Sequence, residues 1–193
     1  MYDVVIVGGG PAGASAATFT ARAGLQTLLI DADTGMTRRA MVNNHLGFPD
    51  GVTGPELVDN GKQQAARAGA EVVAGKVVSL SPAAEGFSVA AEDGASYEGK
   101  QVILTTGANL DLARSAGVAM REGREPRIKE VVTVDPDGRT NVPGIWAAGT
   151  AAGVSVHTII TAGDGARVAI NLISSGKGER HVDHDVLQVA RPA

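Results

Sequence analysis

A short apolar run, rich in β-branched side chains, opens the chain at residues 2–7. Such a run predicts a buried strand. A glycine-rich turn follows at residues 8–13, and the alanine-rich stretch after it, which ends at Gly24, predicts a helix. A second apolar run at residues 26–30 ends in Asp31. The chain therefore begins with a predicted strand, turn, helix and strand, followed by an acid.

Two further helices are expected from the spacing of apolar residues. One begins at residues 54–56, with proline in its first turn, and stops at Gly69. The other covers residues 158–174, where apolar side chains recur at helical spacing. Gly163 and Gly165 lie in its first turns, where glycine costs about 1 kcal/mol relative to alanine. We therefore expect another backbone or a ligand to approach closely there.

β character returns in three stretches, residues 71–80, 86–92 and 101–105. Asp93-Gly94 is a hairpin turn signal between two of them. Together they predict one more parallel strand and a small antiparallel β layer.

The remaining stretches carry weaker patterns. Residues 32–54 are rich in turn residues and predict a long loop, which in a compact chain is usually functional. Residues 109–129 are weakly patterned, with room for a short helix from Asp111. We expect one α/β domain at residues 1–176, with a central parallel sheet, helices on one face and the antiparallel layer on the other. Residues 177–193 form a predicted tail.

The turn at residues 8–13 has the glycine spacing G-x-G-x-x-G of a dinucleotide site. Gly8 permits a turn too tight for a side chain, and Gly10 lets the backbone approach a pyrophosphate. Gly13 lets the following helix pack closely on the first strand. The N–H groups and the dipole at the start of this helix favour bound phosphate.

Asp31 follows this turn at about the sequence spacing at which, in dinucleotide sites, a carboxylate accepts hydrogen bonds from the adenosine ribose hydroxyls. An acid at this position repels a 2′-phosphate, so the site does not suit NADP. The glycines alone would also fit an ordinary turn. The two strands, the helix and the acid together favour a nucleotide site in a Rossmann-like fold.

Composition narrows the function further. The 193 residues include 17 Lys and Arg and 3% aromatic residues, at a net charge of −4, which makes nucleic acid a poor candidate partner. Cysteine is absent from the sequence, which excludes a thiolate nucleophile, an iron–sulfur cluster and a redox dithiol within it. No basic segment precedes the first apolar run, and no apolar run approaches membrane-spanning length. We therefore expect a cytoplasmic protein that does not bind membranes.

For several residues the sequence allows both a functional and a purely structural role. Arg38 and Arg39 could reach the phosphates or ribose of a nucleotide, or be solvated surface arginines. Val77 could present its backbone to an adenine edge, or be a core valine. The tail could bind a metal, but a solvated tail is the stronger expectation and no metal site is predicted. The tail residues concerned are His181, Asp183, His184 and Asp185.

Four blocks of sequence carry a resemblance to a known family. They are VVIVGGGPAGASAA (4–17), NNHLGFPDGVTGPEL (43–57), ILTTGA (103–108) and GRTNVPGIWAAGTAAG (138–153), the last followed by TIITAGDGARVAI (158–170). In this order and spacing they resemble the flavin-binding domain of the thioredoxin reductase family of pyridine nucleotide-disulfide oxidoreductases. The resemblance spans most of the chain, from Met1 to about Ser174.

The resemblance implies that FAD is the cofactor. Its ADP half would lie across the glycine turn and Asp31, and its ribityl chain by Gly149-Thr150. The flavin would lie at the start of the helix at residues 158–174, whose partial positive charge would face the ring edge that becomes negative on reduction. His157, just before this helix, could hydrogen-bond the flavin or deliver a proton, or merely cap or pack. It is the one candidate catalytic residue.

The cofactor-binding residues that we expect from the motifs and the resemblance together are Gly8, Gly10, Pro11, Ala12, Gly13, Asp31, Ala32, Arg38, Val77, Thr105, Thr106, Gly107, Gly149, Thr150, His157, Ile159 and Ile160.

The chain departs from the family pattern in three ways. The family usually inserts a second G-x-G-x-x-G domain, for NADPH, where this chain has only residues 109–137 and no second fingerprint. The family's redox dithiol is missing. The family's usual Gly-Asp at the ribityl chain is Gly149-Thr150 here, although Thr150 can still donate and accept hydrogen bonds.

Two functions remain open. The first is an FAD-dependent oxidoreductase whose electron donor or acceptor is a separate molecule or protein. The second is a flavin-binding or redox-sensing module without turnover of its own, or a subunit of a larger assembly. An NAD-binding dehydrogenase is weaker, because it gives the block at residues 138–170 no role. The resemblance also implies a homodimer.

Overall fold

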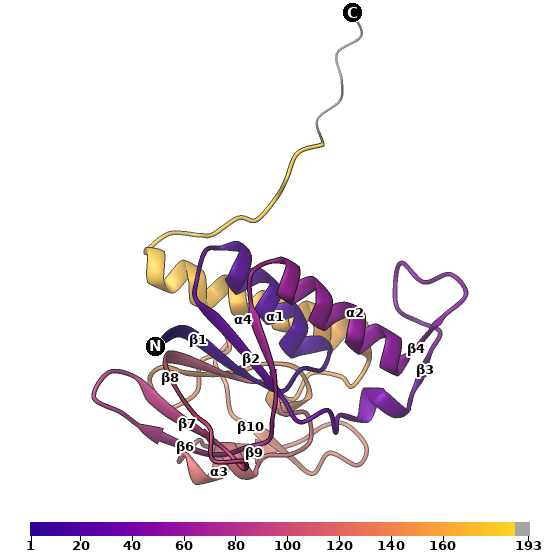
Figure 1. Cartoon of the computed structure of the whole chain (residues 1–193). Helices are drawn as coiled ribbons and strands as arrows, with labels where there is room; N and C mark the ends of the chain where they lie inside the picture. Colours follow the sequence, from indigo (N-terminus) through magenta and orange to yellow (C-terminus); the bar gives the residue numbers. More distant parts are fainter. Residues whose placement is uncertain (188–193) are drawn as a thin grey trace, which may run out of the picture.

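A computed structural model describes residues 1–187 of the chain (Figure 1). Its central feature is a seven-stranded sheet. The hydrogen-bonded order is β5 (Glu71–Ala74), β2 (Thr27–Asp31), β1 (Tyr2–Val7), β8 (Ser96–Leu104), β7 (Phe87–Ala91) and β6 (Val77–Pro82), and β11 (Ile145–Ala147) also pairs with β8. Strands β5, β2, β1, β8 and β11 are parallel, whereas β8, β7 and β6 are antiparallel.

Strand β8 belongs to both parts of the sheet. Its residues 96–99 pair with β7, and its residues 99–104 pair with β1. Gly99 lies where the two pairings meet, and a Cβ there would lie 2.6 Å from Cγ2 of Val5. Glycine therefore lets one strand pass from the antiparallel layer into the parallel sheet.

Three helices cover one face of the parallel sheet and the antiparallel layer covers the other. The helices are α1 (Pro11–Arg22), α2 (Gly54–Arg67) and α4 (Thr158–Lys177). Alternate residues of a strand point to opposite faces, and both faces of β1 are buried. Val4 and Ile6 pack with residues of α1, α2 and α4, whereas Val5 and Val7 pack with residues of β6 and β7. Burial on both faces explains why successive residues of these strands are apolar rather than alternating with polar ones.

These layers confirm the predicted α/β architecture. The predicted loop at residues 32–54 holds the 3₁₀ helix η1 (Met36–Arg39) and a small hairpin of β3 (Met41–Val42) and β4 (Val52–Thr53). The short helix from Asp111 is confirmed as α3 (Asp111–Ser115). An antiparallel pair, β9 (Met120–Glu122) and β10 (Glu130–Val132), lies where the sequence was weakly patterned. The 3₁₀ helix η2 (Gly149–Ala152) follows β11.

Three predicted boundaries were wrong. The single run at residues 71–80 is broken, because the Gly75 N–H donates to the Asp31 carbonyl (3.0 Å) and the chain then turns from β5 into β6. Strand β8 begins at Ser96 rather than at residue 101, since its first residues pair with β7. Helix α4 continues to Lys177, where Gly178 ends it in the left-handed conformation (φ +72°).

The described part of the tail is attached to α1. Arg22 donates to Asp183 (2.8 Å) and to Asp185 (2.7 Å). The hydrogen bond from Arg22 holds the pKa of Asp183 below its usual value. The predicted solvated tail is therefore anchored at these two residues, and its residues 188–193 lie outside the described part of the chain.

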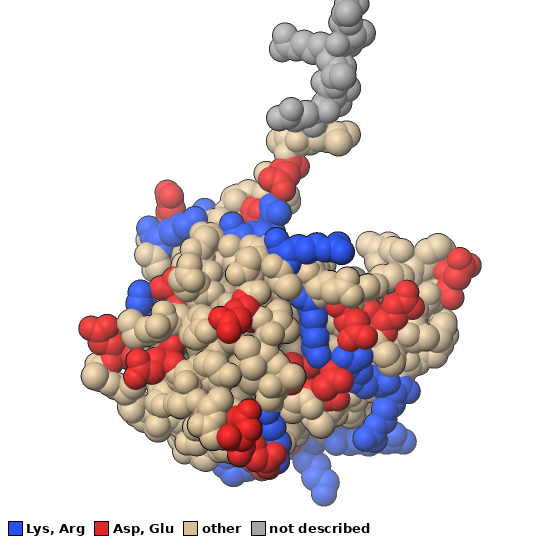
Figure 2. All heavy atoms as spheres, viewed as in Figure 1, with Lys and Arg blue, Asp and Glu red and all other residues tan. Residues whose placement is uncertain are grey.

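Charged side chains of both signs are interspersed on the face shown in Figure 2. Within residues 1–187, no helix is long and apolar enough to cross a membrane.

The two glycines in α4 differ in what surrounds them. A Cβ at Gly165 would overlap the carbonyl oxygen of Ala12 at the start of α1, which confirms the expected close approach of another backbone. Apart from the neighbouring backbone of α4 itself, no heavy atom of the described residues lies within 4 Å of a Cβ built at Gly163.

We expect opposite effects of alanine at these two positions. Gly165→Ala should lower the free energy of unfolding by about 1–3 kcal/mol, because α1 must move away. Gly163→Ala should raise it by up to about 1 kcal/mol through helix propensity. Urea unfolding of both variants measures the difference, and equal effects would contradict the packing of α4 on α1 described here.

Candidate functional site

The carboxyl ends of four parallel strands meet at one edge of the sheet. Strand β2 ends in Asp31, β1 leads into Gly8, β8 leads into Thr105, and β11 leads through Ala148 into Gly149. In open α/β sheets this edge is where ligands bind. The sequence motifs that predicted a nucleotide site are therefore brought together in space.

The glycine turn is held tightly from one side. Gly8 has φ +105°, and a Cβ there would lie 2.5 Å from the Thr105 carbonyl oxygen. A Cβ at Gly13 would overlap the Gly8 carbonyl oxygen. The Thr105 hydroxyl donates to the carbonyls of Val7 (2.9 Å) and Gly8 (2.7 Å). Thr105 therefore shapes the turn with its side chain.

Gly10 differs from the other glycines of the turn. Its φ is −67°, which any residue can adopt, and apart from Gly10 and its two chain neighbours no heavy atom of residues 1–187 lies within 4 Å of a Cβ built there. The described protein thus gives no steric reason for a glycine. A glycine at such a place permits a ligand to approach the backbone closely.

Helices α1 and α4 both begin without a side-chain cap. In the described structure neither Gly10 nor His157, their N-cap residues, makes a side-chain capping bond, and neither first turn contains an acid. Helix α2 provides the contrast, because the Thr53 hydroxyl accepts from the Glu56 N–H (3.3 Å) and Glu56 adds negative charge. The starts of α1 and α4 are therefore available to an electron-rich ligand.

The spacing of these two helix starts suits a long ligand. Gly165 of α4 lies against Ala12 in the first turn of α1, and Gly149, at the start of η2, also packs against Ala12, at 2.8 Å for a built Cβ. Gly165 is two turns beyond the start of α4 at Thr158, which at 1.5 Å per residue places that start about 10 Å away.

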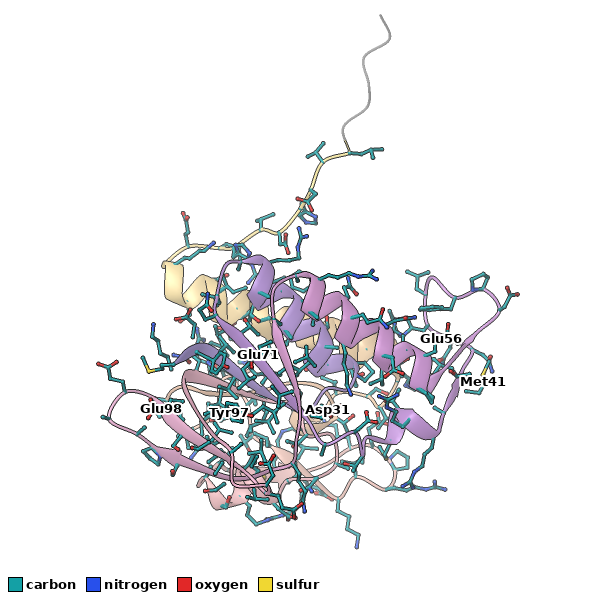
Figure 3. All side chains as sticks on the ribbon, in the orientation of Figure 1. Asp31, Met41, Glu56, Glu71, Tyr97 and Glu98 are labelled. Atoms are coloured by element: carbon teal, nitrogen blue, oxygen red, sulfur yellow. The ribbon has the colours of Figure 1, made fainter. Side chains whose placement is uncertain are left out.

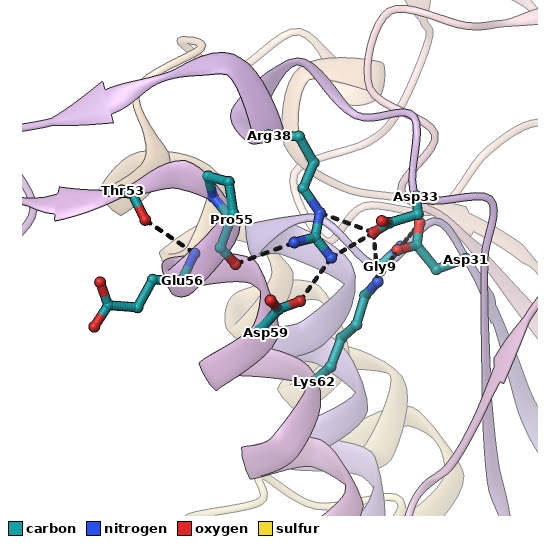
Figure 4. Close-up of polar contacts among 9 residues, drawn as sticks. All are labelled: Gly9, Asp31, Asp33, Arg38, Thr53, Pro55, Glu56, Asp59 and Lys62. Carbon is teal, nitrogen blue, oxygen red and sulfur yellow. Dashed lines mark hydrogen bonds and ion pairs between the residues drawn. The ribbon is translucent and has the colours of Figure 1, made fainter.

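Asp31 lies at the end of β2 and faces the glycine turn (Figures 3 and 4). Its Oδ1 accepts from the Gly9 N–H (2.9 Å), and its Oδ2 contacts the ammonium of Lys62 from α2. A Cβ at Gly9 would lie 2.7 Å from the Asp31 side chain. A glycine at residue 9 therefore lets the carboxylate approach the turn.

Lys62 and Arg38 link this carboxylate to two further acids (Figure 4). Lys62 also lies 2.9 Å from Oδ1 of Asp33. Arg38 donates to Asp33 (2.8 and 2.5 Å) and to Asp59 (2.6 Å). Burial opposes the charge of Lys62, but hydrogen bonds to Asp31 and Asp33 hold its pKa above the usual value. The predicted residue Arg38 is thus engaged with carboxylates, and Ala32 lies exposed between Asp31 and Asp33.

A buried carboxylate supports Gly149 and Thr150. Oδ2 of Asp164 on α4 accepts from the Gly149 N–H (2.7 Å), and its Oδ1 accepts from Arg167 (2.8 Å). Asp164 is 7% exposed. Gly149 itself has φ +73°, so the carboxylate holds a turn that favours glycine.

The start of α4 carries two histidines and exposed apolar residues. Nδ1 of His45, from the loop before α2, lies 2.9 Å from the Thr158 hydroxyl, and burial lowers the pKa of His45. His157 is exposed, with its Nδ1 2.8 Å from the Ser155 hydroxyl. The exposed fractions of the apolar residues Ile159 and Ile160 are 39% and 44%.

The remaining predicted residues lie at the margins of this edge. The Thr106 hydroxyl donates to the Asn109 carbonyl (2.5 Å), and Gly107 has φ +64°. Val77 begins β6, two residues after Gly75, and packs partly buried against the core.

Sequence reasoning did not single out Lys62, Asp164 or His45. An acid between two glycines in an apolar helix was a usable signal for Asp164. His45 lies inside the block at residues 43–57 that carries part of the family resemblance, but no motif marks it. Lys62 had no local signal, because its role depends on how α2 packs beside β2.

Comparison with known proteins decides the family. A model of the family described as pyridine nucleotide-disulphide oxidoreductase matches residues 2–128 and 52–167. The chain belongs to this family. The family suspected from the four sequence blocks is therefore confirmed.

Curated members of the family match part of the chain. Thioredoxin reductase from Streptomyces coelicolor is 41% identical over 109 residues, which are 54% of this chain and 34% of that protein. Thioredoxin reductase from Aquifex aeolicus is 39% identical over 111 residues, which are 56% of this chain and 34% of that protein. The matches thus span about a third of the length of these relatives.

Solved structures share the fold. The atypical thioredoxin reductase TRi from Desulfovibrio vulgaris Hildenborough superposes with a TM-score of 0.81 at 21% identity, covering 93% of this chain and 99% of that one. A thioredoxin reductase from Gloeobacter violaceus gives 0.78 at 18% identity, covering 97% and 99%. The expected Rossmann-like architecture is confirmed.

We expect Asp164→Ala to destabilise the protein by about 1–3 kcal/mol, because it leaves the buried Gly149 N–H without its acceptor. Asp164→Asn keeps an acceptor oxygen and should lose less. Urea unfolding of the two variants provides the test. Equal losses would mean that the ion pair with Arg167, and not the bond to Gly149, stabilises this turn.

Proposed function

We propose that residues 1–176 form an FAD-binding domain of an oxidoreductase, with the cofactor along the edge described above. One observation carries this proposal. Two uncapped helix starts lie at this edge, with the start of α4 about 10 Å along the helix from the contact of Gly165 with Ala12, and with Asp31 beyond the start of α1. A dinucleotide with an anionic centre and a ring that becomes negative on reduction matches both helix starts, and family membership supports the same cofactor.

Successive groups of residues along the sheet edge match successive parts of FAD. The open side of Gly10 and the N–H groups of Ala12 and Gly13 face the pyrophosphate, and Asp31 accepts from the ribose. Gly149 and Thr150 lie by the ribityl chain. The ring lies at the start of α4. Further residues lie near the two ends of the cofactor. Those near the adenosine are Ala32, Arg38 and Val77, and those near the flavin are His157, Ile159 and Ile160.

FAD supplies two-electron transfer when it is bound, and the chain supplies binding, orientation and proton exchange. The start of α4 places partial positive charge beside the ring. His157 is exposed and hydrogen-bonded to Ser155, so its imidazole can exchange a proton with solvent. The exposed Ile159 and Ile160 give the ring an apolar neighbour.

A flavin-binding or redox-sensing module without turnover is the second candidate. The 193 residues contain no cysteine and no second dinucleotide fingerprint, so they lack the dithiol and the nicotinamide site of a disulfide reductase. The first candidate, an enzyme, requires an electron donor or acceptor from outside these residues. The second candidate requires none, because it does not turn over. The homodimer and the cytoplasmic location stay predictions.

FAD binding is tested by reconstitution. The purified chain should take up FAD in near-stoichiometric amount and show flavin absorbance bands. Asp31→Ala should weaken FAD binding about ten- to a hundredfold in a calorimetric titration, because charge-assisted hydrogen bonds to the ribose are lost. Asp3→Ala is the control. Asp3 pairs with Lys100 near the start of β1, whereas the proposed site lies at the carboxyl end of β1. Equal affinities for FAD in all three proteins would overturn the placement of the cofactor.

Turnover is tested with candidate donors. We expect the FAD-loaded chain alone to show no NADPH-dependent reduction of thioredoxin or of a small disulfide reagent. Stopped-flow reduction with NADH and NADPH separates the two candidates, because fast saturable bleaching of the flavin indicates an enzyme. Sustained disulfide reduction by the chain alone would contradict the need for an outside partner.

A further inference from the structure

Both oxygens of the Asp31 carboxylate already have partners within the protein. The Gly9 N–H donates to Oδ1 at 2.9 Å, and the Lys62 ammonium contacts Oδ2. A ribose hydroxyl that donates to Oδ2 of Asp31 therefore also approaches the Lys62 ammonium. The Lys62 and Asp31 side chains are only 19% and 11% exposed, so this pair forms part of the wall of the site.

Lys62 is held in place from its other side. Oδ1 of Asp33 lies 2.9 Å from its ammonium, and Arg38 ties Asp33 to Asp59 and to the Pro55 carbonyl (3.2 Å) (Figure 4). Asp33 has φ +58°, an unfavourable conformation that its two cationic partners help to hold. The position of the ammonium is therefore fixed by α2, β2 and η1 together.

The chemistry of the pair suits an alcohol. A hydroxyl donates one hydrogen bond and accepts others, so it can donate to a carboxylate and accept from an ammonium at once. The cluster has three carboxylates and two cations, which leaves one net negative charge in the described side chains. A phosphate at the same place would meet Asp31 and Asp33 and be repelled.

We propose that Lys62 is a cofactor-binding residue that recognises the adenosine ribose together with Asp31. A ribose hydroxyl donates to Asp31 and accepts from Lys62, so the pair selects an unphosphorylated ribose that carries its hydroxyls. This inference rests on the proposed FAD site and adds to it a residue from α2.

The test compares ADP with 2′,3′-dideoxy-ADP on the same protein by calorimetry of the full chain without FAD. The ratio of the two affinities measures hydroxyl recognition, and any general loss of stability cancels from it. The wild type should prefer ADP about ten- to a hundredfold, as expected for hydrogen bonds to charged groups.

Lys62→Met should reduce this preference about fivefold or more, and Lys62→Arg, which keeps a cationic donor, should retain most of it. Lys100→Met is the matched control, because Lys100 also pairs with an aspartate, Asp3, near the opposite end of β1 (2.8 Å). The preference of this variant for ADP should equal that of the wild type.

The outcomes separate this inference from the proposed function. A wild-type chain that prefers ADP, with the same preference after Lys62→Met, overturns the role of Lys62 and leaves the FAD site standing. A wild-type chain that binds neither ADP nor FAD removes the proposed function and, with it, this inference.

Discussion

The close approach of α1, α4 and the end of β11 is the constraint on which the rest of this edge depends. Ala12 lies at the point of contact, with Gly165 against its carbonyl oxygen and Gly149 against its side chain. Only very small residues allow two helices and a strand to converge in this way. Their convergence brings two helix N-termini to one edge of the sheet, and within residues 1–187 the N-cap residue of neither helix forms a side-chain capping bond.

Electrostatics then divides the edge into unlike parts. At the β2 end, carboxylates and cations from β2, η1 and α2 form a dense network around Asp31. At the α4 end, the partial charge of the helix lies beside two histidines and exposed isoleucines. The β2 end is therefore highly charged and densely paired, whereas the α4 end is partly apolar and exposed.

The sequence was informative wherever local rules determine structure. The buried strands, the glycine turn, α1, α2 and α4 follow from apolar periodicity and from the glycines, and Asp31 follows from its place at the end of a strand. The break at Gly75 did not follow, because it depends on a bond to the Asp31 carbonyl across the sheet. Lys62 and His45 escaped prediction for the same reason, since their partners lie more than ten residues away in sequence. Asp164 had a local signal in its two flanking glycines, but its bond to Gly149 joins residues far apart in sequence.

The turn that follows β8 is built to tolerate an insertion or a deletion. Its hydrogen bonds are local, joining Thr106 to Asn109 and Asp111 to Asn109, and Ala108 and Asn109 are exposed. A polypeptide inserted or removed at such a turn leaves every strand pairing of the sheet intact. This makes the turn a natural junction at which a whole domain can be gained or lost. Chains of very different length can therefore keep one framework and the same edge.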